Sequence, residues 1–488
     1  MISGTSLQET VKKTKSGEIS PLDLVENSYE QIEKYNPSLN AIVSLRQKED
    51  VAKEANALCQ QRDNEEKLLY GIPLAIKDLF NVESLPTTFG WPSLKNNIAK
   101  NNSIIVERVI NHGALILGKT NIPELALGSH TKNYLFGTTS NAFDNSKSAG
   151  GSSGGAASAV ASSMIPIADG SDMMGSCRNP AAFSNLYGFR PTPGLIPENR
   201  IMKIDEQFPL LSTPGCLAKN PDDMAIFLDA VSGVHSMDPF SFDIDGSFRK
   251  FVFKENEFKK MRVGWLGDMN GSYAFEDGIL SLCEKSLKQL EDDHLNVDDA
   301  IHCIDTSMMW DAWTNLRSKN IYLYLKATNI NSCKEFMTLK DFMTLKAFAR
   351  AFLDYGAQYE IEKGRMVSEE SLKRSIEDRS VLSKKIDELF NDYDFLAMPS
   401  AQVFPFDKNI DYPNKISGKE MQTYHQWMEV TVLSSLLGLP TISIPVGFNE
   451  NNLPMGMQII GRKKEDLRVI SFAKRYEQIF GYSNVTSA

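Results

Sequence analysis

The chain has 488 residues, of which 42% are hydrophobic and 9% aromatic, so it can bury a large core. At about 150 residues per domain this length suggests about three domains, although one large domain is also consistent with it. The net charge is −10, spread over a chain that is 23% charged. This composition argues against intrinsic disorder and against a nucleic-acid partner.

Cysteine usage and the lack of long apolar runs indicate the compartment. The six cysteines form no C-x-x-C pair and are too sparse for a disulfide framework, so we expect reduced thiols at Cys59, Cys177, Cys216, Cys283, Cys303 and Cys333. Residues 1–13 lack a basic head followed by an apolar run. The longest uncharged stretches contain prolines or small residues, which are unsuited to a membrane span. The sequence therefore predicts a soluble, cytoplasmic protein without a membrane partner.

Three helices are predicted before residue 65. Ser6 and Glu9 have the spacing of a capping box, and residues 20–23 place a proline at the first position of a second helix. The Asn-Pro pair at 36–37 is expected to end that helix. The charged segment 48–63 predicts a third, exposed helix.

Beyond residue 70 the pattern changes to alternating strands and helices. Residues 71–77 form a short apolar run bounded by Gly and Pro, which is typical of a buried strand. Residues 106–110 then read as the end of a helix. This alternation favours an α/β architecture. Further strands are expected at 114–117, 164–168, 261–266, 395–399, 441–445 and 455–460, with a helix at 276–290.

The middle of the chain contains two compositionally distinct regions. Residues 148–194 concentrate Gly and Ser, and residues 156–163 are all small or Val, which predicts a helix packed close to its neighbours. Residues 235–394 read as mostly helical and more polar. Within them, Phe-Met-Thr-Leu-Lys at 336–340 recurs at 342–346. Two copies do not make a repeat protein, so we interpret them as a local duplication in one amphipathic helix.

Residues 113–120 match the phosphate-binding pattern G-x-x-x-x-G-K-[ST] letter for letter. A phosphate-binding loop is polar and opens a helix, with N–H groups that point at the phosphates. Here the four intervening residues are Ala, Leu, Ile and Leu, and Pro123 follows closely. We therefore expect a buried strand and no nucleotide site.

Two Gly- and Ser-rich turns and one lysine are candidates for chemistry. The turns are residues 150–155, Gly-Gly-Ser-Ser-Gly-Gly, and residues 170–180, which contain Ser176. A serine nucleophile needs a base, but the histidines are scattered at His112, His130, His235, His294, His302 and His425. Lys77 follows an apolar run, so desolvation should lower its pKa and leave a neutral amine that can accept a proton. Alternatively, both serines are turn residues only and Lys77 pairs with a buried carboxylate.

Taken together, these segments resemble the amidase signature family of serine hydrolases. Residues 71–78 fit its lysine segment, 150–155 its first serine turn and 170–178 its second, with further family-like text at 118–124, 180–182, 191–194 and 438–461. The resemblance implies Ser176 as nucleophile, Ser152 as proton relay through a cis peptide after Gly151, and Lys77 as base. It also implies an oxyanion hole made by the backbone N–H groups of Met173, Met174, Gly175 and Ser176. Structural support is expected from Gly151, Ser153, Asp172 and Arg178, and no metal or cofactor is implied.

Three residues depart from the family pattern. Met173 and Met174 stand where Thr and Gly are usual, and Cys177 stands where Ile is common. A positive φ at Met174 would be strained. Alternatively, the two flexible thioether side chains line an apolar acyl pocket. Cys177 is expected to be a packed small hydrophobe rather than a nucleophile.

The resemblance predicts an amidase that hydrolyses a small-molecule carboxylic amide to an acid and an amine or ammonia. One alternative is the glutaminase subunit of a tRNA-dependent amidotransferase, and another is a non-catalytic binding protein on the same fold. The pocket walls are expected within residues 120–145 and 300–430. The sequence leaves the oligomeric state open, with a homodimer among the options.

The implied fold is a single large three-layer α/β/α domain with a central mixed, mostly parallel twisted sheet flanked by helices. We expect the motifs around Lys77, the two serines and residues 438–461 to converge on one sheet. The predicted division is N-terminal helices at 1–65, a catalytic core at 66–235, a more variable helical region at 236–395 and a return to the core sheet at 396–488.

Overall fold

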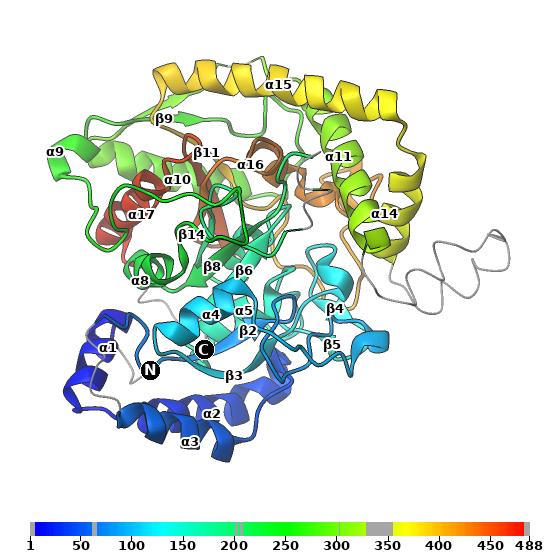
Figure 1. Ribbon diagram of the computed structural model, residues 1–488. Coiled ribbons are helices and arrows are strands. Elements are labelled where there is room, and N and C mark those ends of the chain that lie inside the picture. Colours follow the sequence, from blue (N-terminus) through cyan, green and yellow to red (C-terminus); the bar gives the residue numbers. More distant parts are fainter. Residues whose placement is uncertain are drawn as a thin grey trace, which may run out of the picture.

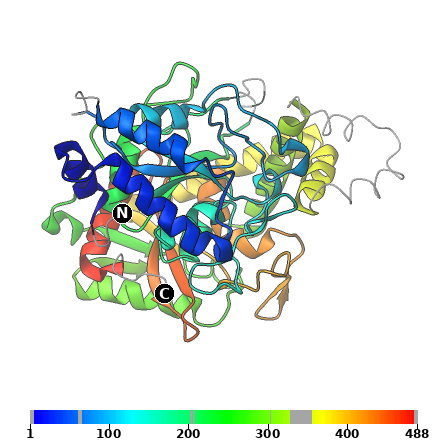
Figure 2. The same cartoon turned by 90° about the horizontal axis from the view of Figure 1, so that it is seen from below.

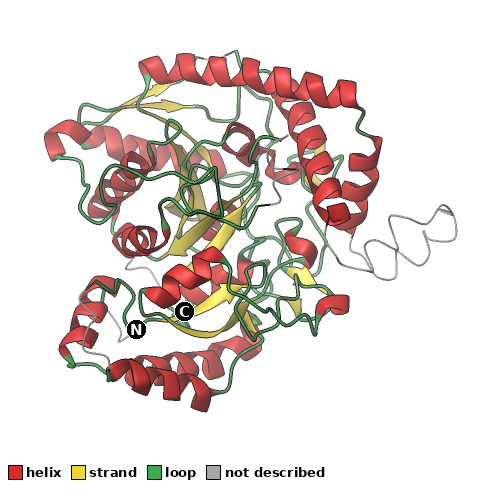
Figure 3. Ribbon diagram, in the orientation of Figure 1, coloured by secondary structure: helices red, strands yellow, loops and turns green. Residues whose placement is uncertain are grey.

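A computed structural model of the protein describes residues 5–60, 66–200, 204, 208–301, 303–327 and 355–482. The predicted duplication at 336–346 lies outside these residues, as do His302 and Cys333. Helices enclose the strands on several sides (Figure 3). None of the helices in the described ranges is long and apolar enough to cross a membrane.

The largest element is an eight-stranded mixed sheet with the order β10-β9-β11-β15-β14-β7-β8-β6 (Figure 1). Its strands are β6 (Ile167–Asp172), β7 (Tyr187–Arg190), β8 (Thr213–Ala218), β9 (Arg262–Trp265), β10 (Asn296–Asp299), β11 (Phe395–Pro399), β14 (Thr441–Phe448) and β15 (Pro454–Ile460). Helices α8 (Pro221–Val231), α10 (Ile279–Asp292) and α17 (Asp466–Phe480) lie on one side, and α11 (Thr306–Ala327) and α16 (Val432–Leu437) lie on the other (Figure 1). The predicted α/β fold, with a mixed sheet flanked by helices, is confirmed.

The expectation of mostly parallel strands is wrong in this sheet. Only β10, β9 and β11 run parallel, and every other neighbouring pair is antiparallel. Strand direction depends on the segments that connect the strands. A parallel pair needs a crossover connection, whereas an antiparallel pair can be joined by a tight turn. Helix α10 (Ile279–Asp292) provides the crossover from β9 to β10, whereas a short turn joins β14 to β15.

The strand that carries Lys77 belongs to a separate three-stranded sheet with the order β1-β3-β2. Its strands are β1 (Ile42–Val43), β2 (Pro73–Lys77) and β3 (Leu115–Thr120). The expectation that all motifs converge on one sheet is therefore wrong. Instead, β2 is an edge strand that contacts β6, the edge strand of the large sheet. The site is built where these two edges meet.

The helices begin and end largely where the sequence predicts. Ser6 caps the first helix through its hydroxyl, and Ser20 and Asp23 form a full capping box on the second. The second helix passes through Pro37 and ends at Leu39, beyond the expected stop. The helices are α1 (Leu7–Ser16), α2 (Pro21–Leu39), α3 (Lys48–Cys59), α4 (Ile104–Asn111), α5 (Gly154–Ala161), α6 (Arg178–Ala182), α8 (Pro221–Val231), α9 (Glu255–Phe258), α10, α11 (Thr306–Ala327), α14 (Tyr355–Met366), α15 (Glu369–Asp392), α16 (Val432–Leu437) and α17 (Asp466–Phe480).

Shorter elements complete the chain. The two-stranded ribbons are β4 (Lys132–Asn133) with β5 (Gly137–Thr138), and β12 (Lys415–Ile416) with β13 (Lys419–Glu420). Short 3₁₀ helices occur at Pro92–Leu94, Glu124–Ala126 and Gln426–Thr431. Helix α15 runs across the top of the molecule and packs on α11 (Figure 1). The blue N-terminal helices lie across the opposite end, which faces the viewer in Figure 2.

Helix α5 explains the small-residue segment. Every one of its residues is buried, and the helix contacts both the small sheet and strands β6 and β8 of the large one. A helix held between two sheets leaves no room for long side chains, so Gly, Ala, Ser and Val fill it. Its N-terminus presents the first serine turn to β2, which brings two of the predicted motifs together.

The phosphate-loop pattern is a false match, as expected. Residues Leu115–Thr120 form the fully buried strand β3. The Lys119 ammonium donates to the Phe80 carbonyl at 2.6 Å and lies 3.5 Å from the Asp78 carboxylate. Lys119 is therefore occupied in holding the segment after β2.

Candidate active site

Three elements bring the predicted catalytic side chains together at the junction of the two sheets. Lys77 is the last residue of β2, Ser152 lies in the turn before α5, and Ser176 lies in the turn between β6 and α6. All three are buried, with exposed fractions of 0%, 1% and 7%. Ser152 and Ser176 line the same cavity.

The amino group of Lys77 is surrounded by hydroxyl groups. Its Nζ lies 2.8 Å from Oγ of each of three serines, Ser152, Ser153 and Ser171. Ser153 also donates its backbone N–H to the Ser176 carbonyl at 3.3 Å. Lys77 is therefore positioned by neutral groups, and these contacts speak against the alternative in which its Nζ pairs with a buried carboxylate.

Burial lowers the pKa of Lys77 to about 8, although nearby carboxylates oppose the shift. Asp169 and Asp172 are those carboxylates. The Cys177 thiol has a raised pKa because it is buried, so it contributes no charge near neutral pH. A lysine with a pKa near 8 is partly neutral at physiological pH and can accept a proton.

Asp169 was not predicted, yet it holds the backbone of Lys77. Both of its carboxylate oxygens accept the Lys77 N–H at 3.2 Å, across the gap between β6 and β2. Burial raises the pKa of Asp169 to about 6, partly offset by the Lys77 N–H and by the charges of Lys77 and Lys119. A polar residue directly after the apolar run 164–168 was the available sequence signal.

The first serine turn has the backbone that the resemblance implies. The peptide between Gly151 and Ser152 is cis. The Gly151 carbonyl accepts from the Ser129 hydroxyl, and the Gly150 carbonyl accepts from the Thr131 hydroxyl at 2.8 Å. Residues 129–131, to which the sequence alone assigns no role in this turn, thus fix the turn that presents Ser152.

The second serine turn is organised around Asp172. Its carboxylate accepts the N–H of Gly175 at 2.9 Å and the N–H of Cys177 at 3.1 Å. Gly175 has φ +80°, and a Cβ there would come within 2.7 Å of Thr431, so glycine is required. The structural role expected for Asp172 is consistent with these contacts.

The Gly175 bond changes the expected oxyanion hole. Because that N–H already donates to Asp172, it is not free to bind an oxyanion. Among the described residues, the N–H groups of Met173, Met174 and Ser176 have no acceptor. The set of candidate donors is therefore reduced from four to three.

Arg178 ties this turn to the C-terminal part of the chain. Its guanidinium donates twice to Asp172, at 2.8 and 3.0 Å, and also to the Thr431 carbonyl at 3.1 Å. A further donor reaches Gln458 on β15. Burial favours the neutral form of Asp172, but the charges of Arg178 and Arg190 prevail and hold its pKa below the usual range.

The residues that depart from the family pattern pack without strain. Met174 has no positive φ among the described backbone angles, and its sulfur accepts from the Trp313 indole N–H at 3.3 Å. Met173 and Met174 both line the cavity. Cys177 is fully buried, as expected for a packed small hydrophobe. The interpretation in which the thioethers line a pocket therefore fits the structure.

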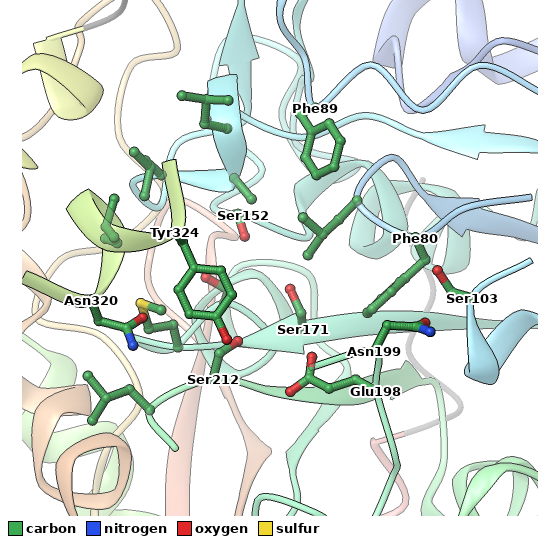
Figure 4. Close-up of a pocket in the computed structure, with 18 of the residues that line it drawn as sticks. Phe80, Phe89, Ser103, Ser152, Ser171, Glu198, Asn199, Ser212, Asn320 and Tyr324 are labelled. Carbon is green, nitrogen blue, oxygen red and sulfur yellow. The ribbon is translucent and has the colours of Figure 1, made fainter. Parts of the chain in front are cut away.

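The cavity has a volume of about 620 Å³. Figure 4 shows Ser152 and Ser171 facing it, with Phe80 and Tyr324 on opposite sides. Part of the wall comes from Leu125–Gly128 and from α11, within the ranges expected from the sequence. The parts contributed by 79–81, 89, 101–105, 197–200 and 209–212 were missed, because these segments carry no recognisable motif. No histidine of the described chain lines this cavity.

Comparison with known proteins places this geometry in a family. A family model described as Amidase matches residues 23–470. The chain belongs to the amidase family. It is 30% identical to an acylamidase from Rhodococcus erythropolis over 478 residues, which cover 97% of this chain and 95% of that protein. It is also 30% identical to one of the subunits of glutamyl-tRNA(Gln) amidotransferase from Natranaerobius thermophilus, covering 97% and 95%.

Solved structures agree with this assignment. A bacterial aryl acylamidase of the amidase signature family superposes on this amidase with a TM-score of 0.87 at 27% identity, covering 98% of this chain and 97% of that one. The 6-aminohexanoate cyclic dimer hydrolase has a TM-score of 0.83, and its 21% identity shows a shared fold. The predicted family and the prediction of an amidase enzyme are confirmed.

Proposed function

We propose that this amidase hydrolyses a carboxylic amide through an acyl-enzyme on Ser176, with Ser152 as proton relay and Lys77 as base. The observation that carries the proposal is the 2.8 Å separation of Lys77 Nζ and Ser152 Oγ beside a cavity that Ser152 shares with Ser176. A partly neutral lysine supplies the base that a serine nucleophile needs.

In the first half-reaction, Ser176 Oγ attacks the amide carbonyl. The hydroxyl proton passes to Ser152 Oγ while Ser152 gives its own proton to Lys77 Nζ. The carbonyl oxygen, now an oxyanion, accepts N–H groups from Met173, Met174 and Ser176. One such donor is worth about 3 kcal/mol in comparable hydrolases.

The tetrahedral intermediate then collapses. The C–N bond breaks as Ser152 protonates the leaving nitrogen and is itself reprotonated by Lys77. In the second half-reaction a water molecule gives a proton through Ser152 to Lys77 and attacks the ester carbon. The bond from this carbon to Ser176 Oγ then breaks, and Lys77 returns the proton through Ser152 to Ser176 Oγ. The net reaction converts an amide and water into a carboxylic acid and an amine or ammonia.

A second candidate is the glutaminase subunit of a tRNA-dependent amidotransferase, which the similarity to the glutamyl-tRNA(Gln) amidotransferase proteins favours. Such a protein would release ammonia from glutamine and pass it to partner subunits. Co-purification with two other subunits, together with glutamine-dependent ammonia release, would support it. Turnover of an acyl amide by the isolated chain supports the amidase instead. A non-catalytic protein, the third option, would turn over neither.

A fluorophosphonate probe tests the nucleophile. We expect a covalent adduct on the peptide that contains Ser176, because the probe reacts with an activated serine. The adduct should disappear in Ser176→Ala and persist in Ser212→Ala, a matched control because Ser212 lines the same cavity. An unlabelled wild-type protein without amide turnover would contradict the proposal.

A further inference from the structure

The walls of the cavity beside Ser176 are mainly apolar. Phe80, Phe89 and Tyr324 face it from different elements (Figure 4), and leucine, isoleucine and methionine side chains fill much of the rest. The Phe80 segment is held from behind by Lys119, which donates to the Phe80 carbonyl. A volume of about 620 Å³ lies within the range of about 300–1,000 Å³ that is typical of sites for drug-sized ligands.

Arg317 is one of two cations among the described lining residues, and its charge is already balanced. Its guanidinium forms an ion pair with Glu360, and the two side chains are 3% and 0% exposed. The Tyr424 hydroxyl accepts from Arg317 and donates to Glu360, each at 2.9 Å. Releasing Arg317 to bind a substrate carboxylate would leave Glu360 buried and unpaired, which is strongly unfavourable.

Arg200 is the other cation, and it is held by two carboxylates. Its Nε donates to both oxygens of the buried Asp238 at 3.2 Å, and the guanidinium also pairs with Glu198. Glu198 itself lines the cavity. To bind a substrate carboxylate, Arg200 would have to leave the buried Asp238, which is unfavourable.

We propose that the substrate of this amidase has an uncharged, bulky, apolar acyl group that packs between Phe80 and Tyr324. The proposal rests on the proposed function and adds the substrate class to it. The described lining offers no free cation for a carboxylate, and an unpaired carboxylate in an apolar site is costly. The described lining therefore disfavours an acyl group with the α-amino and α-carboxylate groups of glutamine, whereas an acyl chain without charge buries apolar surface favourably.

Two substrates that share a leaving group and differ in the charge of the acyl group test this proposal. Pentanoyl p-nitroanilide and γ-glutamyl p-nitroanilide have acyl groups with the same number of carbon atoms, and they differ in the charged groups. We measure kcat/KM from the release of p-nitroaniline and expect it to be about a hundredfold higher for the pentanoyl compound. This ratio corresponds to the free-energy cost of burying a charge without a partner. Equal or higher values for the γ-glutamyl compound would overturn the proposal.

Binding to Ser176→Ala separates this proposal from the proposed function. By isothermal titration we expect the pentanoyl compound to bind and the γ-glutamyl compound to bind at least about a hundredfold more weakly. Binding with that preference but without wild-type turnover would uphold the substrate class and refute the mechanism. The reverse preference would refute the substrate class whatever the turnover.

A variant tests the wall that contacts the acyl group. Tyr324→Ala should lower kcat/KM for pentanoyl p-nitroanilide by about tenfold while changing the value for acetyl p-nitroanilide less than about twofold, since the short acyl group does not reach the ring. Tyr35→Ala, on α2 and outside the lining, is the matched control and should change neither. An equal loss for both substrates in Tyr324→Ala would count against the assigned contact.

Discussion

Lowering the pH from 8 to 6 should slow this amidase steeply, because Lys77 must be neutral to accept a proton. Burial lowers the pKa of this lysine to about 8. The neutral fraction is then about one half at pH 8 and about one hundredth at pH 6, so kcat/KM should fall by about fiftyfold. The sign follows from the role of a base, since activity rises with pH through the pKa and levels off above it.

The assay is a pH profile of kcat/KM from pH 5.5 to 9.5 with an uncharged p-nitroanilide, which does not itself titrate in this range. Lys77→Met, which retains the apolar stem, is the companion variant. It should lose about a hundredfold to ten-thousandfold in kcat, the usual contribution of a general base. The rise of kcat/KM with pH around pH 8 should also be absent from the profile of this variant.

Two results would refute this reasoning. A wild-type profile that is level between pH 6 and 9 would mean that no group with the pKa of Lys77 limits the reaction. A limb near pH 6.5 that persists in Lys77→Met would point to a histidine, although no described histidine lines the cavity. Near-normal kcat in Lys77→Met would exclude the lysine as base.

Three further predictions concern neighbouring residues. Asp169→Asn keeps an acceptor for the Lys77 N–H but removes a negative charge, so the acidic limb should move to lower pH; an unmoved limb in the same pH profile would contradict this effect. Cys177→Ala should retain activity within about tenfold, because the buried thiol serves only in packing. Loss of fluorophosphonate labelling at Ser176 in this variant would contradict the prediction. Arg178→Met should destabilise the protein by about 3–5 kcal/mol, because the buried Asp172 carboxylate loses both hydrogen bonds from Arg178 and keeps, of the two buried arginines, only the 3.4 Å contact with Arg190. The loss should appear as a lower Tm in a thermal shift assay, and an unchanged Tm would show that the network is not stabilising.

The proposed catalytic trio could be named from the sequence because its members lie in short local motifs, and the structure brings the three side chains to one site. Ser152 and Ser176 lie in turns whose glycines are dictated by close contacts, and Gly175 illustrates this because its positive φ and the neighbouring Thr431 exclude a side chain. Lys77 ends an apolar strand, so its burial and lowered pKa follow from the residues around it. These features depend on residues close together in the chain, so the sequence indicates them directly.

The arrangement of the strands could not be read from the sequence. The apolar runs at 73–77 and at 455–460 indicate burial equally, and nothing in them says that the first belongs to a small separate sheet. Strand direction depends on the connections, which are long-range properties of the chain. The predicted strand at 164–168 lies at Ile167–Asp172 instead, because Asp169 and Ser171 interrupt the apolar pattern while serving the site.

The cavity walls were the least predictable part. Phe80, Glu198 and Tyr324 come from segments far apart in the chain, and each segment alone has the composition of ordinary loop or helix. The charge balance of Arg317 depends on Glu360, which lies on another helix. Pairings of this kind arise only when helices pack, so the sequence alone could not indicate them.

Trapping the acyl-enzyme tests the central claim most directly. Protein mixed with an amide substrate and quenched in acid during turnover should gain the mass of the acyl group, and peptide mapping should place it on Ser176. Ser176→Ala should gain no mass under the same conditions, whereas Ser212→Ala should behave like the wild type. An acyl group on Ser152 or Cys177 during turnover would contradict the account. So would the absence of any acyl-enzyme under conditions that slow its hydrolysis while turnover continues.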